Sequence, residues 1–246
     1  MVSPYLKNKG SAVRFCLWPH IMKFIIISFI QKLSFLISYL TKNSFSENKF
    51  LKTIILDEAL VVDVGSNVGS FIKLISNINK KAYIYSIEPN IELIELQKSK
   101  FKNRKNFKFY NFAIDIKEGK RMLYIRNPAS HSSFSKIHQD DKFNEIIDTV
   151  EVQTHTLEKF FSDQNITKIT LLKIDIEGQD YEVLYSIKDL LLNNSIDYIK
   201  IEANQQYIEK IMAFALELNL KFLGISKSFY IKNQFNFLDI YFKNKN

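Results

Sequence analysis

The sequence contains very little cysteine and little histidine. Cys16 is the single cysteine among 246 residues, and the four histidines are scattered along the chain. One thiol cannot close a disulfide within the chain, and so few sulfur and imidazole groups make a structural zinc site unfavourable. Scarce cysteine also fits a reducing compartment, so we expect a cytoplasmic protein.

Two common nucleotide-binding motifs are also missing. An apolar run, 60–62, leads into Asp63-Val-Gly-Ser-Asn-Val-Gly69. The dinucleotide motif G-x-G-x-x-G, counted from Gly65, would need glycines where Asn67 and Ser70 stand. A phosphate-binding P-loop needs Gly-Lys-Ser or Gly-Lys-Thr, and the sequence has neither. The turn after this run therefore matches neither a nicotinamide site nor a nucleoside-triphosphate site.

Excess positive charge is missing from most of the chain. The formal net charge is +8, but residues 1–52 hold eight Lys and Arg against Glu47 alone, which gives +7. The other 194 residues hold 26 basic and 25 acidic groups, a net charge of +1. A nucleic-acid groove needs clustered cations on the active face, so we do not expect nucleic acid as a partner.

The acids and glycines that are present suit a different cofactor. Glycines let the backbone turn sharply and let a ligand approach, and the next helix offers free N–H groups. Asp63 suits the cationic amino-acid end of a ligand, and Glu88, 25 positions later, can accept both ribose hydroxyl protons of an adenosine. A cationic amino acid joined to adenosine describes S-adenosylmethionine. The alternative is an ordinary strand–helix–strand turn with a solvated acid at each end.

An adenine ring would pack where the third predicted strand ends, against Phe112, Ala113 or Ile114, although these apolar residues equally suit the core. The candidate cofactor-binding residues are Asp63, Gly65, Ser66, Asn67, Gly69, Glu88, Asn90 and Ala113.

A second motif, Lys173-Ile-Asp-Ile-Glu-Gly178, also follows an apolar run. Ligands of open α/β sheets bind at the carboxyl ends of the strands, so both motifs are expected in one cleft. Asp175 is the predicted base for a substrate hydroxyl, with Lys173 and Glu177 on the same side. An ammonium between two carboxylates would hold both ionised. The alternative role for the acids is to cap a helix that begins near Gln179.

Other groups could share this chemistry. His155 and His131 are alternative bases, because imidazole titrates near neutrality. Glu202, at the end of the next predicted strand, adds a carboxylate to the same rim. Several carboxylates leave divalent-metal dependence open, but the sequence does not require it, and we predict no metal site.

Four segments together resemble the FkbM-type methyltransferases: Asp63–Gly69, Glu88–Asn90, Asn111–Ile114 and Lys173–Gly178. The serine-rich stretch 130–133 also lies where that family has one. The resemblance covers residues 59–203 and implies a class I, S-adenosylmethionine-dependent enzyme. It further implies O-methylation of a hydroxyl on a sugar, a glycan or a related small-molecule acceptor. Methylation of RNA, or an inactive methyltransferase-like scaffold, are the alternative functions.

The alternation of strand and helix patterns predicts an α/β fold of the Rossmann-like class I methyltransferase type. We expect a seven-stranded, mostly parallel sheet with helices on both faces and one reversed edge strand. A polar, poorly periodic segment at 126–148 is interpreted as a lid over the substrate. The expected sheet strands are 59–64, 83–88, 107–114, 168–175, 196–202, 222–228 and 237–243, with further strands at 121–126 and 149–155. The expected helices are 68–79, 90–102, 179–193 and 204–219.

The basic segment 1–52 is predicted to be an N-terminal helical arm, with the methyltransferase domain at 53–246. Residues 21–40 form an apolar, amphipathic pattern interrupted by Lys23, Gln31 and Lys32. This pattern suits a helix packed on protein, or one lying on the anionic inner face of a membrane, more than a true span, because a lysine at mid-bilayer is costly. Oligomeric state is not predicted.

Overall fold

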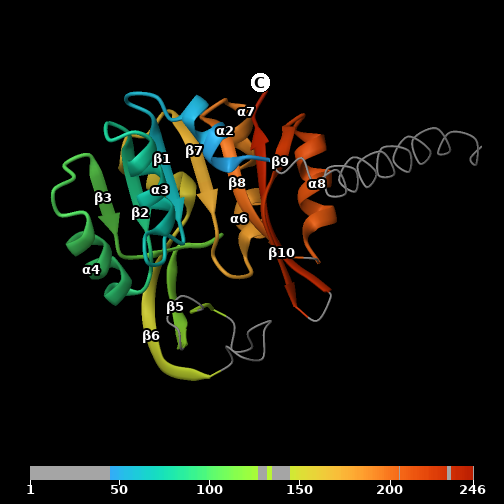
Figure 1. The fold of residues 1–246 in the computed structure, drawn as a ribbon. Helices are drawn as coiled ribbons and strands as arrows, with labels where there is room; N and C mark the ends of the chain where they lie inside the picture. The colour runs from blue at the N-terminus through green and yellow to red at the C-terminus, as the bar shows by residue number, and fades with distance from the viewer. Residues whose placement is uncertain (1–44, 127–131, 135–144, 205, 232–233, 246) are drawn as a thin grey trace, which may run out of the picture. The chain divides into compact units, whose positions relative to one another are not determined.

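The computed structural model describes residues 45–126, 132–134, 145–204, 206–231 and 234–245, and the compact unit begins at Phe45. Its centre is a seven-stranded sheet in the order β3-β2-β1-β7-β8-β10-β9 (Figure 1). The strands are β1 (Leu60–Val64), β2 (Tyr83–Ile87), β3 (Phe107–Tyr110), β7 (Ile169–Ile174), β8 (Ile196–Asn204), β9 (Lys221–Ile231) and β10 (Gln234–Lys243). The predicted α/β class and the seven-stranded, mostly parallel sheet are confirmed.

One detail of the sheet differs from the prediction. Strand β10 is antiparallel to both β8 and β9, while the other neighbouring pairs are parallel. The reversed strand therefore lies second from the edge and not at the edge. The reason is the hairpin itself: β9 leaves a gap beside β8, and β10 folds back to fill that gap.

Helices cover both faces of the sheet (Figure 1). Helices α2 (Glu47–Ile54) and α3 (Ser70–Ile78) pack with Val61, Ile84 and Leu171 in one buried cluster. Successive strand side chains point to opposite faces. Tyr85 accordingly lies on the other face, where its ring contacts Phe160 of α5 (Leu157–Asp163). The remaining helices are α4 (Ile91–Lys100), α6 (Asp180–Ser186), α7 (Lys188–Leu192) and α8 (Ile208–Glu217). The single predicted helix 179–193 is thus two helices, α6 and α7, and α5 was not predicted.

Helix α2 belongs to the core of the domain. The side chain of Leu51 is fully buried, and the ring of Phe50 contacts those of Tyr198 and Tyr241. The compact unit thus begins at Phe45, ahead of the boundary predicted at residue 53, because a segment rich in lysine can still place its apolar face against the sheet.

A small second sheet stands beside the first, in the order β4-β6-β5. It consists of β4 (Ala113–Ile114), β5 (Gly119–Arg126) and β6 (Ile146–His155). The predicted strand 107–114 is therefore split between two sheets, β3 in one and β4 in the other. Within the predicted lid, Ser133 forms an antiparallel bridge with Tyr124 of β5, while 127–131 and 135–144 lie outside the described residues.

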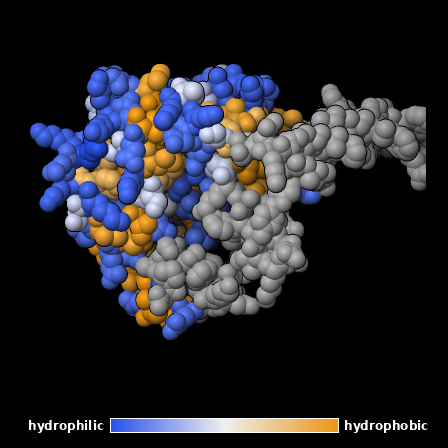
Figure 2. Space-filling view, in the orientation of Figure 1, coloured by the Kyte–Doolittle hydropathy of each residue, from blue (hydrophilic) through white to orange (hydrophobic). Residues whose placement is uncertain are grey.

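The predicted helix at 21–40 also lies outside the described residues. In the part of the chain that is described, no helix has the length and apolar character needed to cross a membrane. Hydrophilic and hydrophobic residues are interspersed on the face of the molecule shown in Figure 2.

Candidate active site

The two sequence motifs meet at the carboxyl ends of β1 and β7. Gly65 has φ +74°, and a Cβ built on it would lie 1.7 Å from the carbonyl oxygen of Asp175. The backbone N–H of Asp175 donates to the carbonyl oxygen of Val64 at 3.1 Å. A side chain at position 65 would thus collide with the backbone that carries Asp175. The glycine is needed for this close approach as well as for the turn.

Glu88 is held rigidly at the end of β2. Its Oε2 accepts a hydrogen bond from the backbone N–H of Asn67 at 2.9 Å, and its Oε1 accepts one from the N–H of Asn90 at 2.9 Å. Burial raises the pKa of Glu88 to about 7, although these two N–H groups favour the ionised form. Each carboxylate oxygen retains a further lone pair that a ligand hydroxyl can use.

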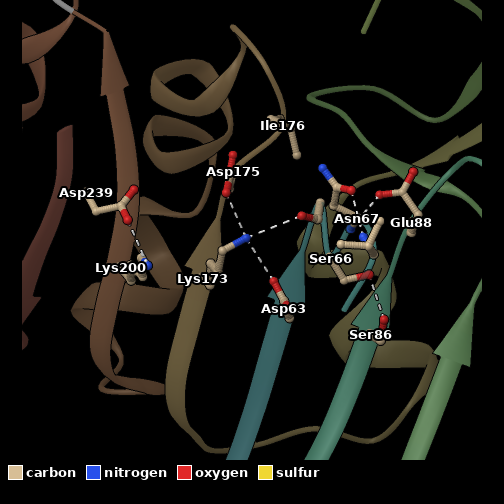
Figure 3. Close-up of polar contacts among 12 residues, drawn as sticks. Asp63, Ser66, Asn67, Ser86, Glu88, Lys173, Asp175, Ile176, Lys200 and Asp239 are labelled. Carbon is tan, nitrogen blue, oxygen red and sulfur yellow. Dashed lines mark hydrogen bonds and ion pairs between the residues drawn. The ribbon is translucent and has the colours of Figure 1, made fainter. Parts of the chain in front are cut away.

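A buried polar network supports the glycine turn from behind. Gln97 of α4 donates from Nε2 to Ser66 Oγ at 2.9 Å and accepts from Ser86 Oγ at 2.6 Å. Ser86 and Ser66 are also bonded to each other, at 2.7 Å (Figure 3). Ser66 is thereby a support for the turn. No sequence pattern pointed to Gln97, which lies 31 residues further along the chain.

Asn90 and Gly69 also serve local structure. The Asn90 side chain caps α4 by accepting from the N–H of Glu92 at 2.9 Å. Gly69, with φ +80°, is the residue from which α3 begins. Asn67, with φ +53°, presents its backbone to Glu88 and lines the pocket described below.

Lys173 joins the two motifs. Its Nζ lies 3.0 Å from Asp63 Oδ1 and 3.0 Å from Asp175 Oδ2, and it donates to the carbonyl oxygen of Gly65 at 3.3 Å (Figure 3). Asp63 is fully buried, whereas the side chain of Asp175 is 30% exposed. Burial alone would lower the pKa of Lys173, but the charges of Asp175 and Asp63 outweigh it and raise that pKa. The Lys173 ammonium therefore links the glycine turn, the buried Asp63 and the partly exposed Asp175.

A second buried ammonium lies on the neighbouring strand. Lys200 pairs in register with Lys173, and its Nζ lies 2.9 Å from Asp239 and 2.9 Å from Glu47 (Figure 3 shows the pair with Asp239). Tyr241 donates to the same Glu47 oxygen at 2.6 Å. No sequence pattern indicated this cluster of Lys200, Asp239, Glu47 and Tyr241, because the cluster forms only when β10 and α2 lie beside β8.

Three carboxylates gather in front of Lys173. One oxygen from each of Asp175, Glu177 and Glu202 lies within 4.8 Å of the others, and all three side chains are partly buried. Burial raises the pKa of Glu202 well above its usual range, and the charges of Asp175 and Glu177 raise it further. Glu177 stands in the turn at φ +58°.

Asp180, the first residue of α6, holds that turn. It accepts from the N–H groups of Ile176 at 2.9 Å and Gly178 at 3.0 Å. Burial, with the charge of Asp175, raises the pKa of Asp180 to about 7. Asp180 thus closes the turn before α6, whose N-cap residue Gln179 makes no side-chain cap hydrogen bond, and the predicted capping by Asp175 or Glu177 is wrong. Asp175 and Glu177 line the pocket instead.

A pocket runs from the glycine turn to the small sheet, enclosing about 580 Å³ together with its open mouth. Eight residues predicted for the site line it: Gly65, Asn67, Glu88, Phe112, Ala113, Ile114, Asp175 and Glu177. Further lining residues, which no sequence pattern assigned to the cofactor, are Leu93 of α4 and, from the small sheet and the segment bridged to it, Leu123, Ser132, Ser133 and Phe134.

The other predicted residues lie behind or beside this pocket. Asp63, Ser66, Gly69, Asn90 and Lys173 support its wall without being among its lining residues. His155 is a register partner of Ile114 in the small sheet and packs edge-on against Phe112, with ring centroids 4.5 Å apart. It is not among the lining residues either. His131 lies outside the described residues.

The family of the chain follows from a match of its sequence. Residues 63–242 match the model of the methyltransferase FkbM domain, which is well over half of the chain. The protein belongs to this family and is an S-adenosylmethionine-dependent methyltransferase. The resemblance seen in the sequence and the predicted cofactor are thereby confirmed. No curated protein matches the chain.

Solved methyltransferase structures resemble the chain at low sequence identity. An rRNA methylase from Streptococcus thermophilus gives a TM-score of 0.49 at 10% identity, covering 80% of this chain and 94% of its own. Aeropyrum pernix fibrillarin, bound to S-adenosyl-L-methionine, gives 0.48 at 10% identity, with 81% and 74% covered. The precorrin-6y C5,15-methyltransferase from Geobacter metallireducens gives 0.47 at 10% identity, with 83% and 92% covered. Such distant likenesses do not indicate the acceptor.

Proposed function

We propose that this methyltransferase methylates a hydroxyl group on a sugar, a glycan or a related small-molecule acceptor, with Asp175 as the general base. The observation that carries the proposal is the position of Asp175. It is a partly exposed carboxylate that lines the pocket and is fixed from behind by Lys173.

The pocket residues fit the cofactor. Glu88 is a buried carboxylate whose two oxygens are already oriented by backbone N–H groups, as needed to accept hydrogen bonds from two adjacent ribose hydroxyls. Gly65 lets a ligand approach the turn, and Ala113 with Phe112 offers an apolar wall for adenine. When bound, S-adenosylmethionine supplies a methyl group on a good leaving group.

Asp175 then has two tasks. It must orient the acceptor hydroxyl in line with the methyl group and take up the hydroxyl proton. Lys173 holds the Asp175 carboxylate with one of its oxygens at 3.0 Å. Asp63 is fully buried and lies outside the pocket lining, so we assign it to holding Lys173 in place.

The carboxylates around Asp175 disfavour an anionic acceptor and can hydrogen-bond hydroxyl groups. Asp175, Glu177 and Glu202 offer acceptors for the hydroxyl groups of a polyol, and the raised pKa of Glu202 favours a protonated form that can also donate. The same group of acids would repel the phosphates of RNA. This argues against the RNA alternative, and the pocket that lies beside these acids argues against an inactive scaffold.

The test is transfer of radiolabelled methyl from S-adenosylmethionine to a panel of free sugars, glycosides and extracted glycans, with transfer RNA and ribosomal RNA in parallel. The proposal expects label on a hydroxyl-bearing acceptor with the native protein and none with Asp175→Asn. Label on RNA alone, or equal turnover by Asp175→Asn, would contradict it.

We further propose that the protein is cytoplasmic and contacts an anionic membrane surface through residues 21–40. The support is the charge of +7 in residues 1–52 and the apolar pattern within them. Sedimentation with vesicles of neutral or anionic lipid tests this. Binding to anionic vesicles that is lost on deleting residues 1–44 is the expected result, and equal binding without them contradicts the proposal.

A further inference from the structure

A cation, Arg121 of β5, connects the small-sheet side of the pocket with the turn that carries Asp175. Its Nη1 lies 2.7 Å from Asp115 Oδ2 and donates to the side-chain oxygen of Gln179 at 2.7 Å. Its guanidinium also lies over the ring of Phe134, 4.2 Å from the ring centroid.

Phe134 lines the pocket, and Asp115 and Gln179 each adjoin a different segment that lines it. Asp115 directly follows β4, whose Ala113 and Ile114 line the pocket. Gln179 ends the turn that carries Asp175 and Glu177. Phe134 belongs to the segment that bridges back to β5, and it lines the pocket itself. The planar side chain of Arg121 thus connects the proposed adenine wall beside β4, the turn that carries Asp175, and Phe134.

The electrostatics make this connection strong. The side chain of Asp115 is only 7% exposed, so its charge depends on partners within the protein. Its other oxygen accepts from the N–H of Ile116 at 2.7 Å. Arginine can bond two acceptors and stack on an aromatic ring at once, whereas lysine provides a point charge only.

We propose that Arg121 is a positioning residue for the cofactor pocket: it sets the distance between the adenine wall and the catalytic turn and holds Phe134 over the bound nucleoside. The inference rests on the cofactor and not on the identity of the acceptor. It assigns a role to a residue that the sequence motifs do not include.

The experiment is calorimetric titration with S-adenosylhomocysteine of four proteins: native, Arg121→Ala, Phe134→Ala and the double variant. Lys120→Ala is the matched control. Lys120 lies on β5 like Arg121, but its ion pair with Glu151 of β6 is on the exposed surface. We expect each single variant to weaken binding by about tenfold. The double variant should lose less than the product of the two single losses, since part of each loss comes from the shared contact between Arg121 and Phe134.

Arg121→Lys separates an effect on binding from a folding defect of the alanine variant. It keeps a positive charge beside Asp115 but loses the planar stacking, so we expect native thermal stability with affinity between those of the native and alanine proteins. Binding by Arg121→Lys and Arg121→Ala equal to that of Lys120→Ala would overturn the proposal. Strictly multiplicative losses in the double variant would overturn it as well, because a merely structural role predicts independent effects. Native protein that binds no S-adenosylhomocysteine would instead overturn the cofactor assignment.

Discussion

Lys173 and Asp63 form a buried ion pair between adjacent parallel strands, with 3.0 Å between Nζ and Oδ1. The two residues are also register partners, so the pair is fixed by the alignment of β1 and β7. Asp175 is bonded to the same ammonium. The position of this proposed base therefore depends on Asp63, whose side chain is fully buried and out of reach of a ligand.

The first prediction concerns this pair. Asp63→Ala leaves the buried Lys173 with one carboxylate fewer, and removing one partner of a buried pair costs about 3–5 kcal/mol of unfolding free energy. Chemical denaturation measures this loss. Lys81→Ala is the control, since it breaks the solvent-exposed pair with Asp57 and should leave stability nearly unchanged. Equal losses in the two variants would contradict the structural role of Asp63.

Gly65 gives a second prediction. Gly65→Ala places a Cβ within 1.7 Å of the Asp175 carbonyl oxygen at a positive φ, so the two motifs must separate. We expect a loss on the order of 3 kcal/mol or more, together with loss of cofactor binding. Gly119→Ala is the matched control, because its φ is also positive but nothing lies within 4 Å of where its Cβ would stand. If the melting temperatures of both variants fall equally, the positive φ alone explains the need for glycine at position 65, and the close approach to Asp175 does not.

The third prediction separates chemistry from binding. Asp175→Asn keeps the shape of the side chain but cannot accept the hydroxyl proton, so turnover should fall by at least about 100-fold. Cofactor affinity should remain within a few fold, because Glu88 and the glycine turn are untouched. Paired measurements of methyl transfer and of calorimetric affinity check both halves. Loss of affinity in proportion to turnover would show that Asp175 holds the cofactor.

Glu88 predicts a pH dependence. Its pKa rises from 4.5 in the unfolded chain to about 7 in the folded protein. The folded state therefore binds more protons between these values, and stability falls as the pH rises from about 4.5 to about 7, by on the order of 3 kcal/mol. Cofactor affinity should rise over the upper part of this range, because the ionised carboxylate is the better acceptor for ribose hydroxyls.

The comparison with Glu88→Gln isolates this contribution from that of Asp180, whose pKa is also near 7. The difference in unfolding free energy between native and variant should depend on pH in the stated direction. A difference that is constant from about pH 4 to about pH 8 would contradict the raised pKa.

The fifth prediction concerns the start of the domain. Removing residues 1–44 should leave folding and cofactor binding intact, whereas removing residues 1–54 also deletes α2. The fully buried Leu51 and the Glu47 carboxylate bonded to Lys200 are then lost. Circular dichroism melts of the two truncated proteins decide the point. Equal stability would place the boundary at residue 53, as the charge pattern alone suggests.

Much of the fold was predictable because local patterns were strong. The buried strands β1 and β7 read as apolar runs, as strands covered on both faces do, and the motifs at their ends had to meet at one sheet edge. The positions of Gly65, Glu88 and Asp175 after β1, β2 and β7 could be predicted for that reason. The match to the family model agrees with this interpretation.

The remaining site residues depend on contacts between distant segments. Gln97 supports the turn across 31 residues, and Glu47 reaches Lys200 across 153. Arg121 meets Gln179 only because β5 joins a second sheet that alternating patterns did not reveal. The turn that Asp180 holds was not predicted, because Glu177 takes a positive φ there, which strand alternation does not anticipate.

The most direct test of the account is calorimetric titration of the native protein with S-adenosylmethionine and S-adenosylhomocysteine, with NAD as the comparison ligand. We predict binding of the first two, none of NAD, and a loss for Glu88→Ala of about 1.5–3 kcal/mol from its charged hydrogen bonds. Native protein that binds neither S-adenosyl compound, or a Glu88→Ala variant with unchanged affinity, would contradict the assignment of this pocket.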